Sequence, residues 1–133
     1  MKWIKRIGIT ILLLPVILII VVISYEIFGM CMNHRATDRQ TGKLEADIRE
    51  KIGDVKILGI YSETGNTSGT GNHVECLSVI TFSTELTAEE IREGMSEAYT
   101  FDGWDCYLKP KDEGFYTFYL RTSAPFPNNI EGH

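Results

Sequence analysis

Histidine and cysteine are scarce in this chain, which has three of each among its 133 residues. The three histidines lack the helical or hairpin spacing that places two imidazoles on one metal ion; they are His34, His73 and His133. The sequence therefore predicts no metal site. The glycine-rich stretch from Gly65 to Gly71 also lacks the Lys-Ser/Thr ending and the helix start of a phosphate-binding loop. We expect no small-molecule cofactor.

Basic residues are outnumbered in most of the chain. Beyond residue 30 there are ten Lys and Arg against seventeen Asp and Glu, which gives this part a net charge of −7. Nucleic-acid binding draws most of its affinity from basic side chains that neutralise phosphates, so this balance excludes nucleic acid as a partner. It also argues against an electrostatic hold on anionic lipid. A basic partner, or no partner, fits this surface better.

One long apolar run stands out against this background. It extends from Ile7 to Ile23, interrupted only by Gly8, Thr10 and Pro15. At a rise of about 1.5 Å per residue it reaches about 25 Å, near the lower limit for crossing the hydrocarbon core of a bilayer. We predict a transmembrane helix, kinked near Pro15 because proline lacks the amide donor.

The charges around this run predict its orientation. Three cations precede it, and the first one downstream is Arg35. The positive-inside bias then holds residues 1–6 in the cytoplasm, with 7–25 as the anchor and the rest outside. Trp3 and Tyr25 lie near the two ends, where aromatic rings prefer the headgroup layer. The predicted location is the cell membrane, with a single pass.

Two alternatives to an uncleaved anchor involve processing. Val22-Ile23-Ser24 could serve as a signal-peptidase site, but no Ala-x-Ala is present and the run is longer than a normal signal core. Cys31 could carry lipid after cleavage, but Met30 stands where a small residue is wanted. The uncleaved anchor is favoured, and each alternative still places the remaining chain outside the cytoplasm.

The chain beyond the anchor predicts a small α+β domain. Residues 26–40 are polar without a period and predict a connector. Residues 41–123 follow in the order helix, strand, strand, helix, strand, strand, with the second helix opened by a capping box at Thr87 to Glu90. We expect an antiparallel four-stranded sheet with both helices on one face. Residues 124–133 form an irregular tail, because Pro125 and Pro127 cannot continue a ladder.

The cysteines suggest one disulfide. Cys76 and Cys106 both fall in predicted strands, and an oxidising compartment would favour a bridge between them. Such a bridge would close a loop of about 30 residues and stabilise the domain by roughly 3 to 4 kcal/mol. The alternative is that both are reduced thiols within the core. Cys31 is left over, and its spacing favours no particular role.

Aromatic residues gather in the last third of the chain. If helices cover one side of the sheet only, the other side would present rings suited to binding a protein. The candidates for partner contact are Trp104, Tyr107, Tyr116 and Tyr119. The alternative is that both faces are buried, or that the rings serve only to stabilise cross-strand pairs.

These features predict a membrane-anchored extracytoplasmic binding or accessory module that engages another protein at the cell envelope. On this interpretation it is not an enzyme. Two other classes stay open. One is a thiol-dependent enzyme that uses Cys76 or Cys106 with His73. The other is a structural single-pass subunit of a membrane complex.

Overall fold

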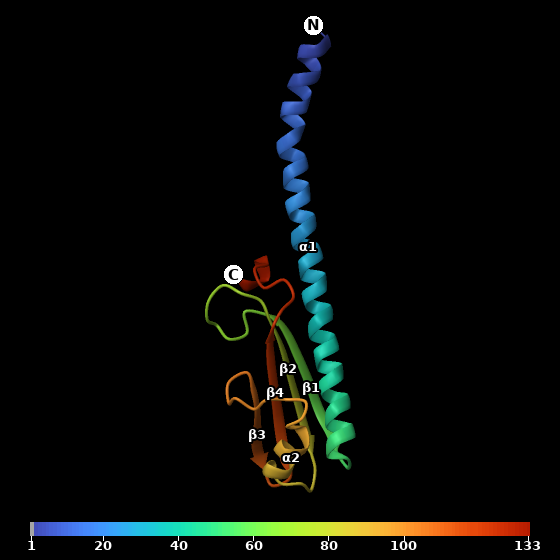
Figure 1. Ribbon diagram of the computed structural model, residues 1–133, viewed down its shortest axis with the longest axis vertical. Helices are drawn as coiled ribbons and strands as arrows, with labels where there is room; N and C mark the ends of the chain where they lie inside the picture. The colour runs from blue at the N-terminus through green and yellow to red at the C-terminus, as the bar shows by residue number, and fades with distance from the viewer. Residues whose placement is uncertain (1) are drawn as a thin grey trace.

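A long N-terminal helix dominates the computed structural model, which describes residues 2–133 (Figure 1). Helix α1 spans Lys2–Ile52, and its 51 residues extend about 77 Å at 1.5 Å per residue. Its first half projects alone, whereas its second half lies along a sheet. Pro15 lies inside the helix, which continues past it.

The remaining elements form an α+β domain in the predicted order. The strands are β1 (Lys56–Gly65), β2 (Glu75–Ser83), β3 (Cys106–Asp112) and β4 (Phe115–Ser123), and they pair antiparallel in the order β1-β2-β4-β3. Helix α2 (Ala88–Met95) lies between β2 and β3 in sequence, and a 3₁₀ turn, η1 (Ile130–Gly132), ends the chain. The predicted αββαββ order and four-stranded antiparallel sheet are confirmed.

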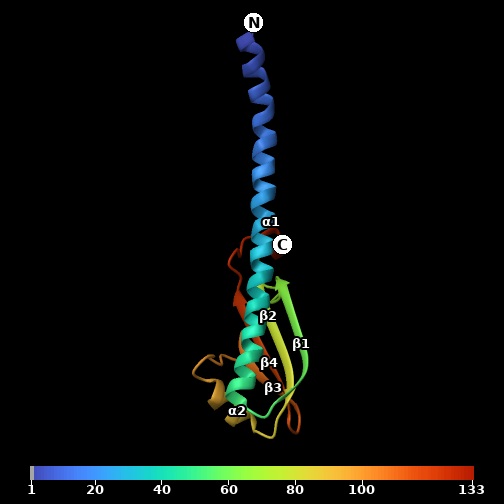
Figure 2. The same cartoon turned by 90° about the vertical axis from the view of Figure 1, so that its right-hand side faces the viewer.

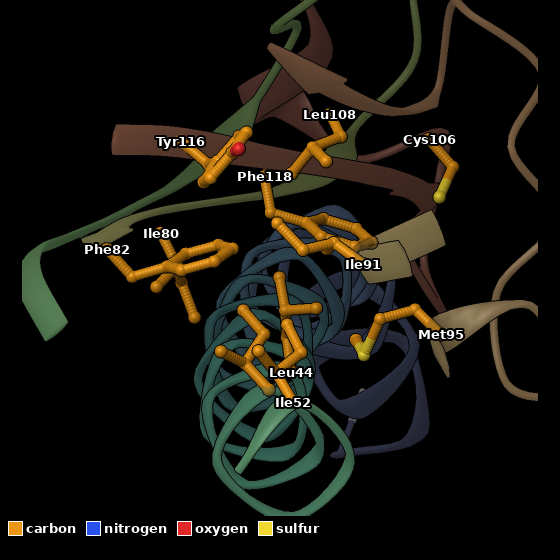
Figure 3. Packing of buried hydrophobic residues seen from close by; sticks show 11 residues of the cluster. Leu44, Ile52, Ile80, Phe82, Ile91, Met95, Cys106, Leu108, Tyr116 and Phe118 are labelled. Atoms are coloured by element: carbon orange, nitrogen blue, oxygen red, sulfur yellow. The ribbon is translucent and has the colours of Figure 1, made fainter. Parts of the chain in front are cut away.

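The hydrophobic core lies between the helices and one face of the sheet (Figure 3). Leu44, Ile48 and Ile52 line the side of α1 that meets the sheet, and Ile91 and Met95 of α2 join them. The sheet contributes alternate residues from three strands, Ile80, Phe82, Leu108, Tyr116 and Phe118. Because side chains alternate across a strand, the opposite face of the sheet receives neither helix.

Helix α2 begins at the predicted capping box. The Thr87 hydroxyl accepts a hydrogen bond from the Glu90 amide, and the Glu90 carboxylate accepts one from the Thr87 amide at 2.7 Å. These two bonds satisfy amides that the first turn of a helix otherwise leaves unpaired. The sequence prediction for the start of this helix is therefore confirmed.

The predicted connector at 26–40 does not form a separate segment, because α1 runs through it without a break. Polar side chains of this region bind the sheet instead. Thr37 and Thr41 contact the hydroxyls of Thr64 and Ser78, at 2.6 and 2.7 Å. The Gln40 side chain donates to the carbonyl oxygens of Cys76 and Leu120, at 3.0 and 3.2 Å, and to the Ser78 hydroxyl at 3.1 Å. The helix continues because the sheet supplies partners for these polar groups.

The C-terminal tail, residues 124–133, forms turns and the short helix η1, and it is bound to α1 by hydrogen bonds and ring contacts. Asn33 is fully buried, and its side-chain amide donates to the Phe126 carbonyl at 3.0 Å and accepts from the Phe126 amide at 2.9 Å. The Phe126 ring packs edge-on against both Tyr25 and Phe28. A Cβ atom at Gly29 would lie 2.8 Å from the side-chain nitrogen of Asn129, so any larger residue there would displace the Asn129 side chain from its place against α1.

The first half of α1 meets the length and composition of a membrane span. Its large apolar side chains from Ile7 to Ile23 are about half to three-quarters exposed, and none packs against the domain. This is the one helix of the described chain that is long and apolar enough to cross a bilayer. A signal sequence near the N-terminus has the same properties.

Candidate binding surface

The face of the sheet turned away from the helices carries a row of tyrosines. Register places Tyr61 of β1 opposite Val79 of β2, Val79 opposite Tyr119 of β4, and Tyr119 opposite Tyr107 of β3. These four residues therefore cross the sheet on one face, since directly opposed residues share a face. We call this row the tyrosine row.

Two rings of the tyrosine row are in direct contact. The rings of Tyr107 and Tyr119 stack with their centroids 4.5 Å apart and their planes 11° from parallel. Tyr61 is 54 % exposed, and its hydroxyl donates to the Glu63 carboxylate at 2.6 Å. Aromatic rings with polar tips on a rigid strand lose little conformational entropy on contact, which suits them to a protein interface.

The loop before β3 is attached to the same face. The Arg121 guanidinium pairs with the Asp105 carboxylate at 3.0 Å and also donates to the Trp104 carbonyl at 3.2 Å. Arg121 is two residues from Tyr119 on β4, so its side chain shares the face of the tyrosine row. Trp104 is 79 % exposed, and its backbone is thereby fixed beside that row.

A single carboxylate organises this loop. One oxygen of Asp102 accepts hydrogen bonds from the amides of Trp104, Asp105 and Cys106, at 2.8 to 2.9 Å. The Cys106, Trp104 and Asp105 amides stabilise the ionised form and hold the pKa of Asp102 below its ordinary value. Gly103 completes the turn with φ of +81°, a left-handed conformation that favours glycine. Trp104 is therefore presented on an ordered loop.

Of the four predicted contact residues, Trp104, Tyr107 and Tyr119 lie at the face of the sheet turned away from the helices, and Tyr116 faces the core. Tyr116 is only 7 % exposed, packs against Phe82 in the core, and donates its hydroxyl to the Leu86 carbonyl at 2.9 Å. It lies three positions from Tyr119 along β4, and an odd spacing in a strand places two side chains on opposite faces. Tyr116 is therefore a core residue, and its prediction as a contact residue is wrong.

Tyr61 was missed by the sequence reasoning. It lies in β1, about 45 residues before Tyr107 and outside the aromatic-rich last third of the chain, so composition gave no reason to group it with Tyr107 and Tyr119. Alternation alone would have misplaced it, because Tyr61 lies four positions after the core residue Ile57 and would then face the core. A β-bulge between Ile57 and Gly59 shifts the register and turns Tyr61 to the other face. Only the strand order places it in the same row.

The predicted disulfide is not formed. All three cysteines of the described chain are unpaired, with Cys76 and Cys106 buried and Cys31 exposed. Strand β4 lies between β2 and β3, so the two buried cysteines are separated by two strand spacings, about 10 Å. A disulfide spans at most about 7 Å between Cα atoms without backbone movement. The alternative of two reduced core thiols is the one observed.

The structure does not assemble the Cys/His pair of the enzyme hypothesis from the residues it describes. Cys76 lies under α1, where its thiol is directed to the Asn33 carbonyl, while the His73 ring contacts Glu75 at 2.8 Å. Burial raises the pKa of Cys76, and burial with the nearby Asp102 raises that of Cys106 to about 11. Such thiols are poor nucleophiles at neutral pH.

Glu75 of β2 holds the loop between β1 and β2 in place. Glu75 is 7 % exposed, and its carboxylate accepts bonds from the hydroxyl of Thr67 at 2.7 Å and from the hydroxyl and amide of Ser68. Burial alone would raise the pKa of Glu75, but the bonds from Thr67, His73 and Ser68 outweigh it and lower that pKa. The loop is thus an ordered part of the domain.

Comparison with known proteins gives no relative from which a function could be inferred. No protein-family model matches the chain, and no curated protein or solved structure is significantly similar to it. The fold and the surface define a class only: a small α+β domain carried by a long, partly apolar N-terminal helix, with one face of its sheet left uncovered.

Proposed function

We propose that this chain is a single-pass membrane protein whose extracytoplasmic domain binds another protein through the tyrosine row. In this proposal the N-terminus stays in the cytoplasm, the first half of α1 crosses the bilayer, and the second half is part of the displayed domain. The observation that carries the proposal is the row itself, because stacked, partly exposed tyrosines on an uncovered sheet face are typical of interface centres.

Contacts just beyond the apolar run support an anchor that is not removed. The Asn129 side chain donates to the Glu26 carbonyl at 2.9 Å, and the Ile130 amide donates to the Glu26 carboxylate at 3.1 Å. The helix immediately after Ser24 is therefore bound into the fold. Proteolytic sites concentrate in exposed, loosely held segments, and the neighbourhood of Ser24 is helical instead.

Charge supports a basic protein as the partner. The chain beyond residue 30 carries −7, and the Glu63 carboxylate lies beside the tyrosine row, where it accepts from the Tyr61 hydroxyl. Complementary charge accelerates encounter and discriminates among partners more than it adds affinity. The rings of Tyr107, Tyr119 and Trp104 would then supply the apolar contact area.

Site-directed photo-crosslinking tests this proposal in the membrane of the source cells. A photoreactive phenylalanine derivative replaces Tyr119 in one version of the full-length protein and Tyr107 in another. We expect both to give the same discrete adduct with one protein, because both rings belong to the proposed contact area. The matched control carries the same derivative at Glu89, an exposed position on α2, and should give no such adduct. Equal adducts at all three positions, or none at the two tyrosines, would contradict the proposal.

A further inference from the structure

The sheet has two edge strands, β1 and β3, and β1 lies at one side of the sheet in Figure 2. The two edges differ in how many of their outward backbone groups are hydrogen-bonded. In an antiparallel ladder, alternate residues direct both backbone groups to the same neighbouring strand, and the residues between them direct both groups the other way. The register therefore shows which residues of each edge strand face outward. An outward group without a partner is free to pair with another chain.

The outer edge of β3 is closed at three successive outward positions. The Cys106 carbonyl accepts from the amides of Asp102 and Gly103, and the Cys106 amide donates to the Asp102 carboxylate. The Leu108 carbonyl accepts from the Arg92 guanidinium at 3.5 Å. The third outward residue is Pro110, which has no amide to donate. This edge therefore offers fewer free backbone groups to another strand than an open edge does.

The same alternation can be followed across the sheet to β1. Gln40 donates to the carbonyls of both Cys76 and Leu120, which confirms that these residues direct their backbone groups into the space between β2 and β4. The alternate residues of β2, which include Val79, then direct their backbone groups to β1. Tyr61 lies opposite Val79 and therefore directs its own backbone groups to β2. The outward residues of β1 on this side of its bulge are Ile60, Ser62 and Thr64.

The outer edge of β1 is open. No hydrogen bond joins the backbone groups of Ile60 or Ser62 on this edge to any other part of residues 2–133. Residues 58–63 are all exposed, and Leu58, Ile60 and Tyr61 among them are 46 to 54 % exposed. Edge strands of natural sheets are normally short, charged, bulged, interrupted by proline or covered. Strand β1 has ten residues and no proline, its charged residues are Lys56 and Glu63, and its bulge lies before Ile60.

We propose that β1 receives an extended segment of a different protein as an added strand. This inference rests on the proposed function, and it specifies how the partner binds. The added strand would pair with the outward backbone groups of Ile60, Ser62 and Thr64 and extend the tyrosine row beyond Tyr61. Because the domain carries −7, the segment should combine apolar or β-branched residues with Lys or Arg.

The anchor argues against a second copy of this chain as the added strand. Strand β1 runs back along α1, so a two-fold axis that pairs β1 with β1 antiparallel turns the second α1 end for end. The two apolar halves would then point in opposite directions and could not enter one membrane. Parallel pairing of two identical edges is not two-fold symmetric, and it is the less stable ladder.

Proline at an outward position provides a selective test. Ser62→Pro removes one outward amide but none of the bonds to β2, and Pro110 shows that this sheet accepts proline at an outward position. The matched control is Ser62→Ala, which keeps the amide. Phage-displayed linear peptides are selected on the full-length protein in lipid nanodiscs, and the enriched peptides are then synthesised for affinity measurements. We expect Ser62→Pro to weaken binding about tenfold or more, and Ser62→Ala to change it little.

Hydrogen exchange on the wild-type protein gives a second measurement that does not depend on how the proline variant folds. Bound peptide should slow exchange of the outward amides of Ile60, Ser62 and Thr64, while the outer edge of β3 should be unaffected.

Peptides that bind Ser62→Pro as tightly as wild type would overturn strand addition, and so would failure to enrich any peptide above empty nanodiscs. A wild-type dimer that Ser62→Pro dissociates would overturn the commitment to a different protein. An adduct at Tyr119 that survives in Ser62→Pro would leave the proposed function standing and reject strand addition alone.

Discussion

Replacing Leu44 with alanine should lower the free energy of unfolding by about 3 kcal/mol, the usual size for a fully buried leucine. Leu44 has no exposed surface and packs in the core with Ile48 of the same helix and Phe82 of the sheet. The truncation removes apolar contacts and leaves a cavity that a rigid helix cannot close. Chemical denaturation of the full-length protein in detergent, followed by near-ultraviolet circular dichroism, measures the change.

The matched control is Leu18→Ala on the same helix. Leu18 is 56 % exposed and contacts nothing in the domain, so this substitution should leave domain unfolding unchanged within about 0.5 kcal/mol. The pair tests whether α1 has two halves with different roles. No effect at Leu44 would show that the second half of α1 is not a structural part of the domain, and an equal loss at Leu18 would show that the two halves do not have different roles.

Replacing Asn33 with alanine should destabilise the domain by about 2 kcal/mol and release the C-terminal tail. Both atoms of the Asn33 amide bond the backbone of Phe126, so the substitution leaves an amide and a carbonyl without partners beneath the tail. Limited proteolysis should then cut residues 124–133 much faster than in the wild type. Asn128→Ala is the control, because Asn128 is exposed and its side chain has no hydrogen bond within residues 2–133. A tail that stays protected in Asn33→Ala would contradict this account of its attachment.

The sequence predicted the elements of the domain better than the course of α1. The core stripe of the helix continues upstream from Leu44 through Thr41, Thr37 and Asn33 at intervals of three and four, as a helix requires. Its upstream members are polar, so hydrophobic periodicity gave no sign of them. Their partners lie on strands 27 or more residues away, such as Thr64 and Ser78. Local pattern cannot show such partners.

The disulfide prediction was wrong for a similar reason. Compartment and strand membership made Cys76 and Cys106 a natural pair, but a bridge depends on which strands are neighbours. A plain meander would have placed β3 beside β2, whereas the chain inserts β4 between them. The alternation of side chains along each strand was visible in the sequence, yet the order of strands was not.

The binding surface could be predicted in part. The contrast between Tyr116 and Tyr119 follows from their spacing alone, because residues three apart in a strand face opposite ways. Sequence could not say which of the two faces the helices cover. That was decided by packing, since Ile91 and Met95 of α2 and Leu44 of α1 meet the Tyr116 side. The inclusion of Tyr61 required the register across all four strands.

The central claim is that the domain stands outside the cytoplasm on an uncleaved anchor, and the natural cysteines allow a direct test. Cys31 is exposed at the base of the domain, whereas Cys76 and Cys106 are 2 and 5 % exposed. A membrane-impermeant maleimide applied to intact cells should therefore label the full-length wild-type protein in the membrane fraction at Cys31, and Cys31→Ser should remain unlabelled. Labelling that appears only after the cells are opened, or a labelled product that begins after Ser24 and leaves the membrane, would contradict the claim.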